Sequence, residues 1–389
     1  MSDIVLSASV RQNLLSLQST ADLLSTTQNR LATGKKVNSA LDNPTNYFTA
    51  QSLDSRASDI NNLLDGIGNG VQVLQAANTG ITSLQKLVDS AKSIAQQVLQ
   101  APVGYSTKST VTSAVAVGTA ANLVDGTGIK SGDTLTIAAT GGGTATSITF
   151  GASLSLDAFN TALAPNNLQA SLDNTGKLVI TTTNDAASAT IGAVASSSAG
   201  TVGTAFTGLT ATAPVADAGS QATRANLVSQ YNNIIAQITT TAQDSSYNGI
   251  NLLNGDNLKL TFNETGKSTL NITGVTFNAT GLGLASLTSG TDFLDSGSAN
   301  KVITKLGAAS SSLRSQASAL GSNLSVVQIR QDFSKNLINV LQTGSSNLTL
   351  ADTNQEAANS QALSTRQSIA VSALALANQS QQSVLQLLR

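Results

Sequence analysis

Large aliphatic residues recur every seven positions near the start of the chain. One row comprises Val10, Leu17, Leu24 and Leu31. Leu14 and Ala21 form a second row, offset between the members of the first, that should also face the partner helix. This spacing is typical of a helix that packs lengthwise on another helix. The sequence therefore predicts a coiled-coil helix that ends at Gly34, a residue suited to a helix terminus.

A second, longer helix is predicted from residue 44. Asn43 is a suitable N-cap, and Pro44 suits the first helical position. One seven-residue register then runs through Leu53, Ile60, Ile67, Leu74, Ile81, Val88 and Ala95. Gly66, Gly68 and Gly70 each weaken a helix by about 1 kcal/mol relative to Ala, so we expect tertiary packing to carry the helix across them.

The last third of the chain repeats this pattern. A shorter helix is marked by Leu227, Ile234 and Ile238. Two further helices contain Leu306, Leu313, Leu320, Val327, Leu341 and Leu348, and then Leu363, Ala370, Ala377 and Val384, flanked by Leu374 and Leu388. After the shorter helix and before the other two, the segment NLKLTFNETGKSTLNITGVTF alternates between apolar and polar residues and turns at ETGK, which predicts a β-hairpin. The helices at the two ends of the chain are predicted to be partners.

The middle of the chain is rich in Ala, Gly, Ser and Thr and contains neither Arg nor Glu. TLTIA, SITF and KLVITTT are candidate strands, DNTGK is a candidate turn and SLDAFNTAL a candidate helix. The chain is therefore predicted to be mainly α with a β-rich insertion, an α+β fold. Its parts would be a terminal coiled coil (1–43 with 348–389), a helical core with a β-hairpin (44–103 with 219–347) and an outer β-rich domain (104–218).

Composition removes several classes of function. Only 11% of the 389 residues are charged and the formal net charge is −1, so no basic surface exists for nucleic acid or an anionic bilayer. The chain contains no Cys and no His, the usual ligands of transition metals and the commonest nucleophile and general base. We predict no catalysis, no metal site and no cofactor.

The first residues, MSDIVLSASVRQN, lack the basic stretch and apolar core of a cleaved secretion signal. No apolar run approaches the roughly 20 residues that a membrane span needs. We therefore expect a protein that stays in the cytoplasm or leaves by a route that uses no cleaved signal.

The predicted terminal helices have too little apolar surface to fold alone. Burying the aliphatic side chains of residues 1–44 compensates only part of the entropy lost when that backbone is ordered. Pairing one helix from each end leaves each aliphatic row half covered, so neighbouring copies should supply the missing contacts. The predicted polymerisation interface consists of Val10, Leu14, Leu17, Leu24, Leu31, Leu363, Leu374, Val384, Leu387, Leu388 and Arg389.

Several motifs follow one another along the two helical zones. They are QNRLATGKKVNSALDNP, LQAANTGITSLQKL, SYNGINLLNGD leading to GLGLASL, ALGSNLSVVQIRQDF and ALALANQSQQSVLQLLR. Together they resemble bacterial flagellin, the subunit of the flagellar filament. The resemblance implies a hairpin-shaped, extracellular structural protein used for motility. Its two ends would form the inner coiled-coil layer of the filament, and its inserted domain would lie outermost.

The resemblance also implies partners. These are copies of the chain itself, the hook–filament junction and filament cap proteins, the flagellar type III export apparatus and an export chaperone. In receptor-stimulating flagellins the helix that matches VDSAKSIAQQ carries Arg and Glu, whereas Ser90, Lys92 and Ser93 stand there in this chain. We therefore expect weak or no recognition by the Toll-like receptor for flagellin.

Two other features depart from the family pattern. The insertion precedes YNGINLL, whereas the outer domain commonly follows the hairpin. In addition, Asn43-Pro44-Thr45-Asn46-Tyr47 replaces the usual run of small residues. The fold of the insertion and the bend before the second helix therefore cannot be borrowed from the family.

A surface adhesin with a coiled-coil stalk and a β-rich head is the alternative function. It predicts a secretion signal or a membrane anchor, and the sequence shows neither. An enzyme would need a convergent polar pocket built from Asp, Glu, Lys or Ser alone.

Overall fold

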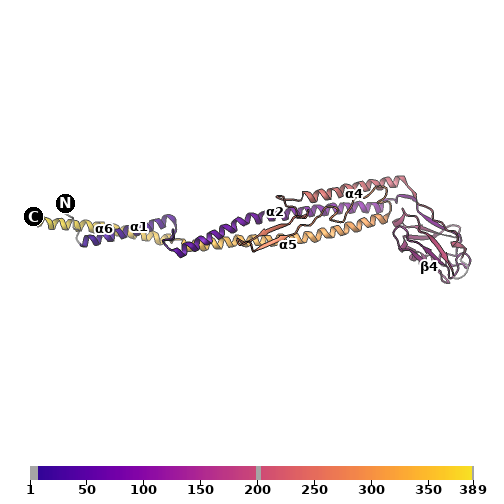
Figure 1. Cartoon of the computed structure of the whole chain (residues 1–389), viewed down its shortest axis with the longest axis horizontal. Coiled ribbons are helices and arrows are strands. Elements are labelled where there is room, and N and C mark those ends of the chain that lie inside the picture. Colours follow the sequence, from indigo (N-terminus) through magenta and orange to yellow (C-terminus); the bar gives the residue numbers. More distant parts are fainter. Residues whose placement is uncertain (1–7, 199–202, 388–389) are drawn as a thin grey trace. The chain divides into compact units, whose positions relative to one another are not determined.

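The protein is described by a computed structural model that covers residues 8–198 and 203–387 (Figure 1). Its α-helices are α1 (Ala8–Thr33), α2 (Pro44–Gln100), α3 (Leu156–Leu163), α4 (Ala218–Asp244), α5 (Ser296–Thr349) and α6 (Thr353–Leu387). Its strands are β1 (Tyr105–Thr107), β2 (Thr110–Ala116), β3 (Thr134–Ile137), β4 (Thr146–Thr149), β5 (Leu168–Leu172), β6 (Lys177–Thr182), β7 (Val194–Ser197), β8 (Val215–Ala216), β9 (Leu258–Thr261) and β10 (Thr269–Ile272). The predicted α+β class, helical with a β-rich insertion, is confirmed.

The chain folds as two compact units. One contains the residues up to Gly70, the segment Lys259–Leu270 and the residues from Val326 onward. The other contains Val71–Leu258 and Asn271–Ser325. The three-part division predicted from composition stays a prediction.

The predicted boundary between the first two helices is confirmed. α1 ends at Thr33, and Gly34 follows with a left-handed φ of 67°. This conformation lets the Gly34 carbonyl accept a hydrogen bond from the Ala351 N–H at 2.9 Å. Asn43 caps α2, because its Oδ1 accepts a hydrogen bond from the Asn46 N–H at 3.0 Å.

α2 is buried along one face over most of its length. The register positions Ile60, Ile67, Leu74, Ile81, Val88 and Ala95 are all buried. In the first unit a Cβ on Gly70 would collide with the side chain of Leu260. In the second unit a Cβ on Gly80 would collide with Leu253. These two glycines admit neighbours close to the α2 backbone; nothing in the structure explains Gly66 or Gly68.

The second unit contains a helical bundle, a name we use for α4 together with residues 71–100 of α2 and 296–325 of α5. The α5 register residues Leu306, Leu313 and Leu320 are no more than 1% exposed. The predicted helix around Leu227 and Ile238 is α4, and both residues are buried. The bundle therefore has a continuous aliphatic core.

Arg224 of α4 is buried at one end of this bundle, with 1% of its surface exposed. Its guanidinium donates to the carbonyl oxygens of Val98 at 3.1 Å, Ala101 at 2.9 Å, Pro102 at 2.6 Å and Phe293 at 2.5 Å. The first three acceptors lie at the end of α2, where carbonyls lack a partner within the helix. Burial lowers the Arg224 pKa, but a guanidinium stays charged at neutral pH.

The inserted segment begins and ends beside this bundle. β1 pairs with β8 in an antiparallel ladder that sets Tyr105 opposite Ala216. The Asp217 N–H also donates to the Gly104 carbonyl at 3.0 Å. The two ends of the insertion are therefore held together by backbone hydrogen bonds.

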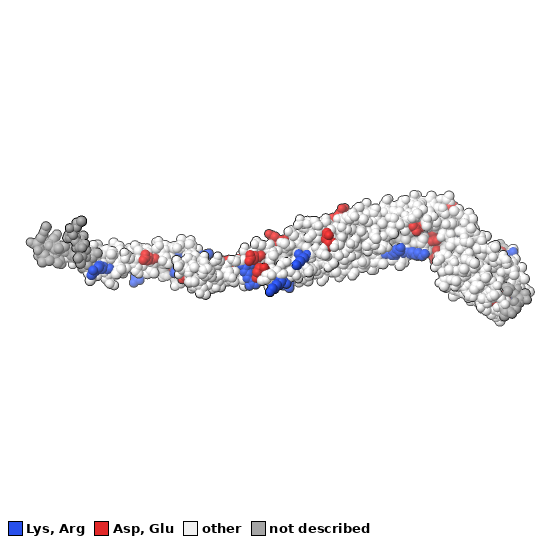
Figure 2. Space-filling model, in the orientation of Figure 1, with Lys and Arg blue, Asp and Glu red and all other residues white. Residues whose placement is uncertain are grey.

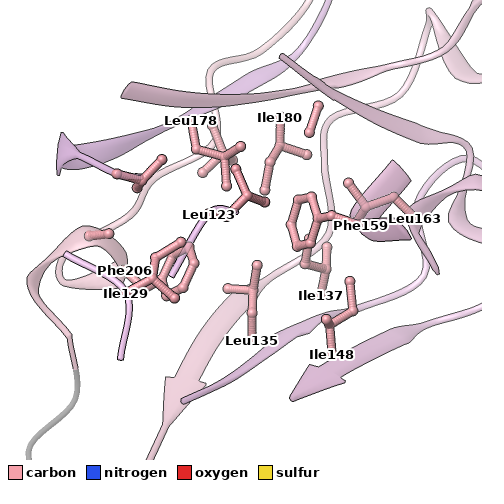
Figure 3. Close-up of a cluster of buried hydrophobic side chains, with 14 of the residues drawn as sticks. Leu123, Ile129, Leu135, Ile137, Ile148, Phe159, Leu163, Leu178, Ile180 and Phe206 are labelled. Carbon is pink, nitrogen blue, oxygen red and sulfur yellow. The ribbon is translucent and has the colours of Figure 1, made fainter. Parts of the chain in front are cut away.

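Two three-stranded antiparallel sheets make up most of the insertion, in the strand orders β2-β6-β5 and β4-β3-β7. The predicted strands TLTIA, SITF and KLVITTT are confirmed as β3, β4 and β6, and the predicted helix is α3. Figure 3 shows Leu178 and Ile180 of β6 pointing toward Leu135 and Ile137 of β3, with Phe159 of α3 between them. The insertion therefore has a hydrophobic core of its own.

β9 and β10 form the predicted hairpin. The Phe262 N–H donates to the Ser268 carbonyl at 2.8 Å on either side of the ETGK turn. Two cations from long helices lie against this hairpin. Arg56 of α2 forms an ion pair with Glu264 in the turn, with a nitrogen–oxygen distance of 2.7 Å. The guanidinium carbon of Arg330 in α5 lies 5.8 Å from the centre of the Phe262 ring, just before the turn.

Candidate subunit interface

α1 and α6 lie side by side, with the end of α1 next to the start of α6 (Figure 1). Arg30 in the last turn of α1 forms an ion pair with Glu356 in the first turn of α6, with a nitrogen–oxygen distance of 3.4 Å. A cation at a helix C-terminus and an anion at a helix N-terminus both interact favourably with the helix dipoles. The predicted pairing of the two chain ends is confirmed.

Polar residues occupy half of the α1 surface that packs on α6. The buried and half-buried positions of this helix are Val10, Asn13, Leu17, Thr20, Ala21, Leu24, Thr27 and Arg30. The prediction that Leu14 packs on the partner helix is wrong, because Leu14 is 39% exposed whereas Thr20 is buried. Thr20 can be buried because its Oγ1 donates to the Ser16 carbonyl at 2.8 Å, which satisfies the hydroxyl within the helix.

The facing surface of α6 is also mixed in character. Its least exposed positions are Glu356, Ser360, Leu363, Gln367, Ala370, Leu374 and Ala377. Two of these seven residues are large aliphatics and three are polar, and Glu356 Oε2 is buried without a hydrogen-bond partner. The seam, as we call the α1–α6 contact formed by these two sets of positions, therefore gains little hydrophobic stabilisation for its length.

Large aliphatic side chains cover the outside of the same helix pair. With exposed fractions between 39% and 70%, the outer aliphatic set comprises Leu14, Leu15, Leu23, Leu31, Ile369, Val371 and Leu376. An open groove of about 490 Å³ on α6 is lined by Ser368, Ile369, Ser372, Ala373 and Leu376. Large exposed apolar patches are typical of interaction sites, so the outside of the α1–α6 pair is the candidate interface.

The predicted interface residues fall into three groups. Leu14 and Leu31 are exposed, whereas Val10, Leu17, Leu24, Leu363 and Leu374 are buried or half-buried in the seam. Val384 and Leu387 lie in the last turns of α6, where their side chains are not described, and Leu388 and Arg389 lie outside the described residues. The interface itself therefore stays a prediction.

Sequence reasoning missed five residues of the outer aliphatic set. These are Leu15, Leu23, Ile369, Val371 and Leu376. All of them lie outside the seven-residue registers of the two terminal helices. A count of aliphatic residues on the opposite helix face would have found them.

Few charged side chains appear on the face shown in Figure 2, as expected from the composition. Within residues 8–198 and 203–387, no three Asp or Glu side chains are grouped as metal ligands would be. None of the helices in these ranges combines the length and apolar character of a membrane span. The chemistry of the described surface is therefore dominated by small polar and aliphatic groups.

Two family models match the chain. "Bacterial flagellin N-terminal helical region" matches residues 5–115, and "Bacterial flagellin C-terminal helical region" matches residues 303–388. The chain belongs to the bacterial flagellin family. The first match continues beyond α2 into β2, and the second contains most of α5 and all of α6. The family regions of this flagellin therefore include both helices of the α1–α6 pair.

Curated flagellins are similar to the chain over part of its length. Flagellin FljM of Caulobacter vibrioides is 32% identical over 165 residues, which are 42% of this chain and 59% of FljM. Flagellin FljK of the same organism is 32% identical over 167 residues, with the same two shares. Flagellin A of Rhizobium meliloti is 32% identical over 124 residues, which are 32% of this chain and 27% of Flagellin A. The matched part thus spans 59% of the length of the first two relatives.

Proposed function

We propose that this flagellin is a structural subunit that polymerises into a helical bacterial flagellar filament used for motility, without catalysis. The observation that carries the proposal is the α1–α6 pair, which has a half-polar seam and a large aliphatic surface outside it. Covering that surface with neighbouring copies would contribute about 1.5–3 kcal/mol for each aliphatic side chain that becomes fully buried. Repeated contacts between identical copies produce a helical polymer when they do not close into a ring.

The predicted interface residues have two roles in this proposal. Val10, Leu17, Leu24, Leu363 and Leu374 hold the helix pair together, because they lie in the seam. The remaining predicted residues contact neighbouring copies: Leu14, Leu31, Val384, Leu387, Leu388 and Arg389. The pair would form the inner layer of the filament.

Membership of the flagellin family supports the other parts of the proposal. The subunit would be exported unfolded by the flagellar type III apparatus with an export chaperone, without a cleaved signal. It would then join an extracellular filament beneath the cap and beyond the hook–filament junction. The near-zero net charge gives it no attraction to nucleic acid or membranes.

Weak or absent recognition by the flagellin Toll-like receptor is part of the same proposal. Ser90 and Ser93 are exposed on α2, and Lys92 is half-buried. The short neutral side chains of Ser90 and Ser93 offer a receptor neither the charge nor the reach of Arg and Glu.

Seeded assembly tests the proposed function. Purified monomer is added to short filament seeds, and filament length is followed by electron microscopy. We expect growth from the intact chain and no growth from a chain that lacks residues 380–389. The Gln382→Ala variant, altered at one exposed position of the same segment, should grow normally. Unimpaired growth of the truncated chain would contradict the proposal.

A further inference from the structure

The seam positions of α1 and α6 coincide in one antiparallel alignment. This alignment can be followed from the Arg30–Glu356 ion pair, backward along α1 and forward along α6. Seam positions recur at three- and four-residue intervals on both helices, so those of α1 lie opposite those of α6. The opposed pairs are Thr27 with Ser360, Leu24 with Leu363, Thr20 with Gln367, Leu17 with Ala370, Asn13 with Leu374 and Val10 with Ala377. We call this alignment the seam register.

The aliphatic residues of the seam do not select this register. They recur every seven residues, so a shift of α1 along α6 by seven residues would bring another set of aliphatic residues into contact. Leu24 would lose Leu363, whereas Leu17 would exchange Ala370 for Leu363. The hydrophobic effect is non-directional and scales with the apolar area buried. The two alignments therefore gain similar hydrophobic free energy.

The ion pair does distinguish the two alignments. Arg30 and Glu356 are the charged members of the two sets of seam positions, and Glu356 is 8% exposed. After a shift by seven residues this carboxylate would face Leu24, and a buried charge without its partner is strongly unfavourable. A polar group at one such position can fix the register of paired helices at a cost in stability. Glu356 Oε2, buried without a hydrogen-bond partner among the described residues, is consistent with such a cost.

Backbone hydrogen bonds beside the ion pair join the α1–α2 loop to the junction of α5 and α6. The Ala351 N–H donates to the Gly34 carbonyl at 2.9 Å, and the Lys36 N–H donates to the Thr349 carbonyl at 2.7 Å. Ala351 and Thr349 are buried. Each bond joins two particular residues, so a shift by seven residues would break both bonds and leave buried backbone groups without partners. We call these two bonds, together with the adjoining ion pair, the clasp.

We propose that the clasp, rather than the aliphatic seam, sets the register of α1 on α6. The inference concerns the single chain and does not depend on polymerisation. A shift by seven residues would move α1 along α6 by about 10 Å, so chains in different registers would present different outer aliphatic surfaces. The clasp thus makes every copy present the same surface, which repeated contacts between identical copies require.

Cysteine pairs test the register directly, because the chain itself contains no Cys. The in-register pair is Leu17→Cys with Ala370→Cys, and the shifted pair is Leu17→Cys with Leu363→Cys. Dilute monomer is oxidised with copper phenanthroline, and mass spectrometry measures the fraction of chains with an internal disulfide. Position 363 is closer to the clasp than position 370, so random encounters of unpaired helices would favour the shifted pair. An excess of the in-register disulfide therefore reports the register.

With the clasp intact, we expect at least about fivefold more disulfide from the in-register pair than from the shifted pair. The double variant Arg30→Leu/Glu356→Leu removes the ion pair and lets a shifted seam place leucine against leucine, so the ratio should fall to about twofold or less. The matched control, Arg11→Leu/Asp59→Leu, removes one exposed cation and one exposed anion outside the clasp and should leave the ratio unchanged.

Adding Lys36→Pro to the double variant also removes the backbone donor to Thr349 and should lower the ratio further. A ratio that stays at its original value in both clasp variants would overturn the inference, as would an intact chain that shows no excess of the in-register disulfide. Seeded filament growth is measured separately, so its failure would contradict the proposed function without affecting this result.

Discussion

The α1–α6 pair and the helical bundle share a seven-residue spacing but bury it to different degrees. In the bundle, Ile81, Val88 and Leu313 are fully buried. In the α1–α6 pair, Leu17 and Leu24 are only half-buried, and polar residues fill the alternate seam positions. The spacing therefore tells which helices pack together, whereas the residues at the seam decide whether the packing is stable in a single chain. We expect the bundle to be rigid in the monomer and the pair to open readily.

The largest effect should come from the bundle's buried cation. Replacing Arg224 with Met leaves the carbonyls of Val98, Ala101, Pro102 and Phe293 without their donor in a buried site. We expect a loss of about 3–5 kcal/mol in the free energy of unfolding of the monomer, measured with urea. Arg314→Met removes an exposed cation on α5 and should change stability by less than about 0.5 kcal/mol. Equal losses would show that Arg224 does not stabilise the bundle.

A matched pair of leucine truncations tests the comparison directly. Leu313→Ala in the bundle should destabilise the monomer by about 2–5 kcal/mol, because it leaves a cavity in a closed core. Leu24→Ala in the seam should cost less than about 1 kcal/mol in the monomer, since the side chain is already half in water. Leu24→Ala should still slow seeded filament growth. Urea unfolding of the two variants measures the first effect, and equal costs would remove the distinction between the two regions.

Replacing the polar seam positions should make the α1–α6 pair more like the bundle. A variant with Thr20→Ile, Thr27→Ile and Gln367→Leu adds three large aliphatic side chains to the seam. We expect the pair to become about 1–2 kcal/mol more stable, seen as slower amide hydrogen exchange in α1 and α6 of the monomer. Thr26→Ile, at an exposed neighbouring position, is the control. Unchanged exchange in the triple variant would mean that seam composition does not limit the pair.

Alkaline pH should destabilise the bundle but not the α1–α6 pair, and we expect this effect to be smaller than those above. Burial raises the pKa of Tyr231 in α4 to about 12 from the ordinary value of 10.0. The contribution of Tyr231 to the free energy of unfolding is fully present below pH 10.0 and is lost as the pH rises toward 12, because the tyrosine of the unfolded chain loses its proton first. At roughly pH 11 we expect the bundle to be destabilised by on the order of 1 kcal/mol.

Neither α1 nor α6 contains a tyrosine, so the α1–α6 pair should be unaffected over the same pH range. Tyr231→Phe should abolish the alkaline effect, measured by urea unfolding at roughly pH 9 and 11. If the Tyr231→Phe variant and the unmodified chain lost the same stability between these two pH values, Tyr231 would be excluded as the cause.

Features set by neighbouring residues were predictable from the sequence. Gly34 and Asn43 mark helix boundaries because their own backbone and side chain make the cap. The ETGK turn and strands β3, β4 and β6 were likewise predicted, since alternation and turn residues are local signals. The family resemblance came from such local motifs as well.

Features set by distant parts of the chain were not predictable. The choice of Thr20 rather than Leu14 for the seam depends on which face α6 covers. The sheet orders place β6 between β2 and β5, which no local pattern specifies. The four acceptors of Arg224 come from two distant segments, so its burial could not be read from the residues around it.

The β1–β8 ladder determines how the insertion is joined to the helices. Because Tyr105 pairs with Ala216 and the Asp217 N–H donates to the Gly104 carbonyl, the inserted segment leaves and rejoins the helical part of the chain at nearly the same place. Domains whose ends meet in this way can be exchanged with little disturbance to their host. Replacing the residues beyond the β1–β8 ladder should therefore leave the fold of the adjoining helices unchanged.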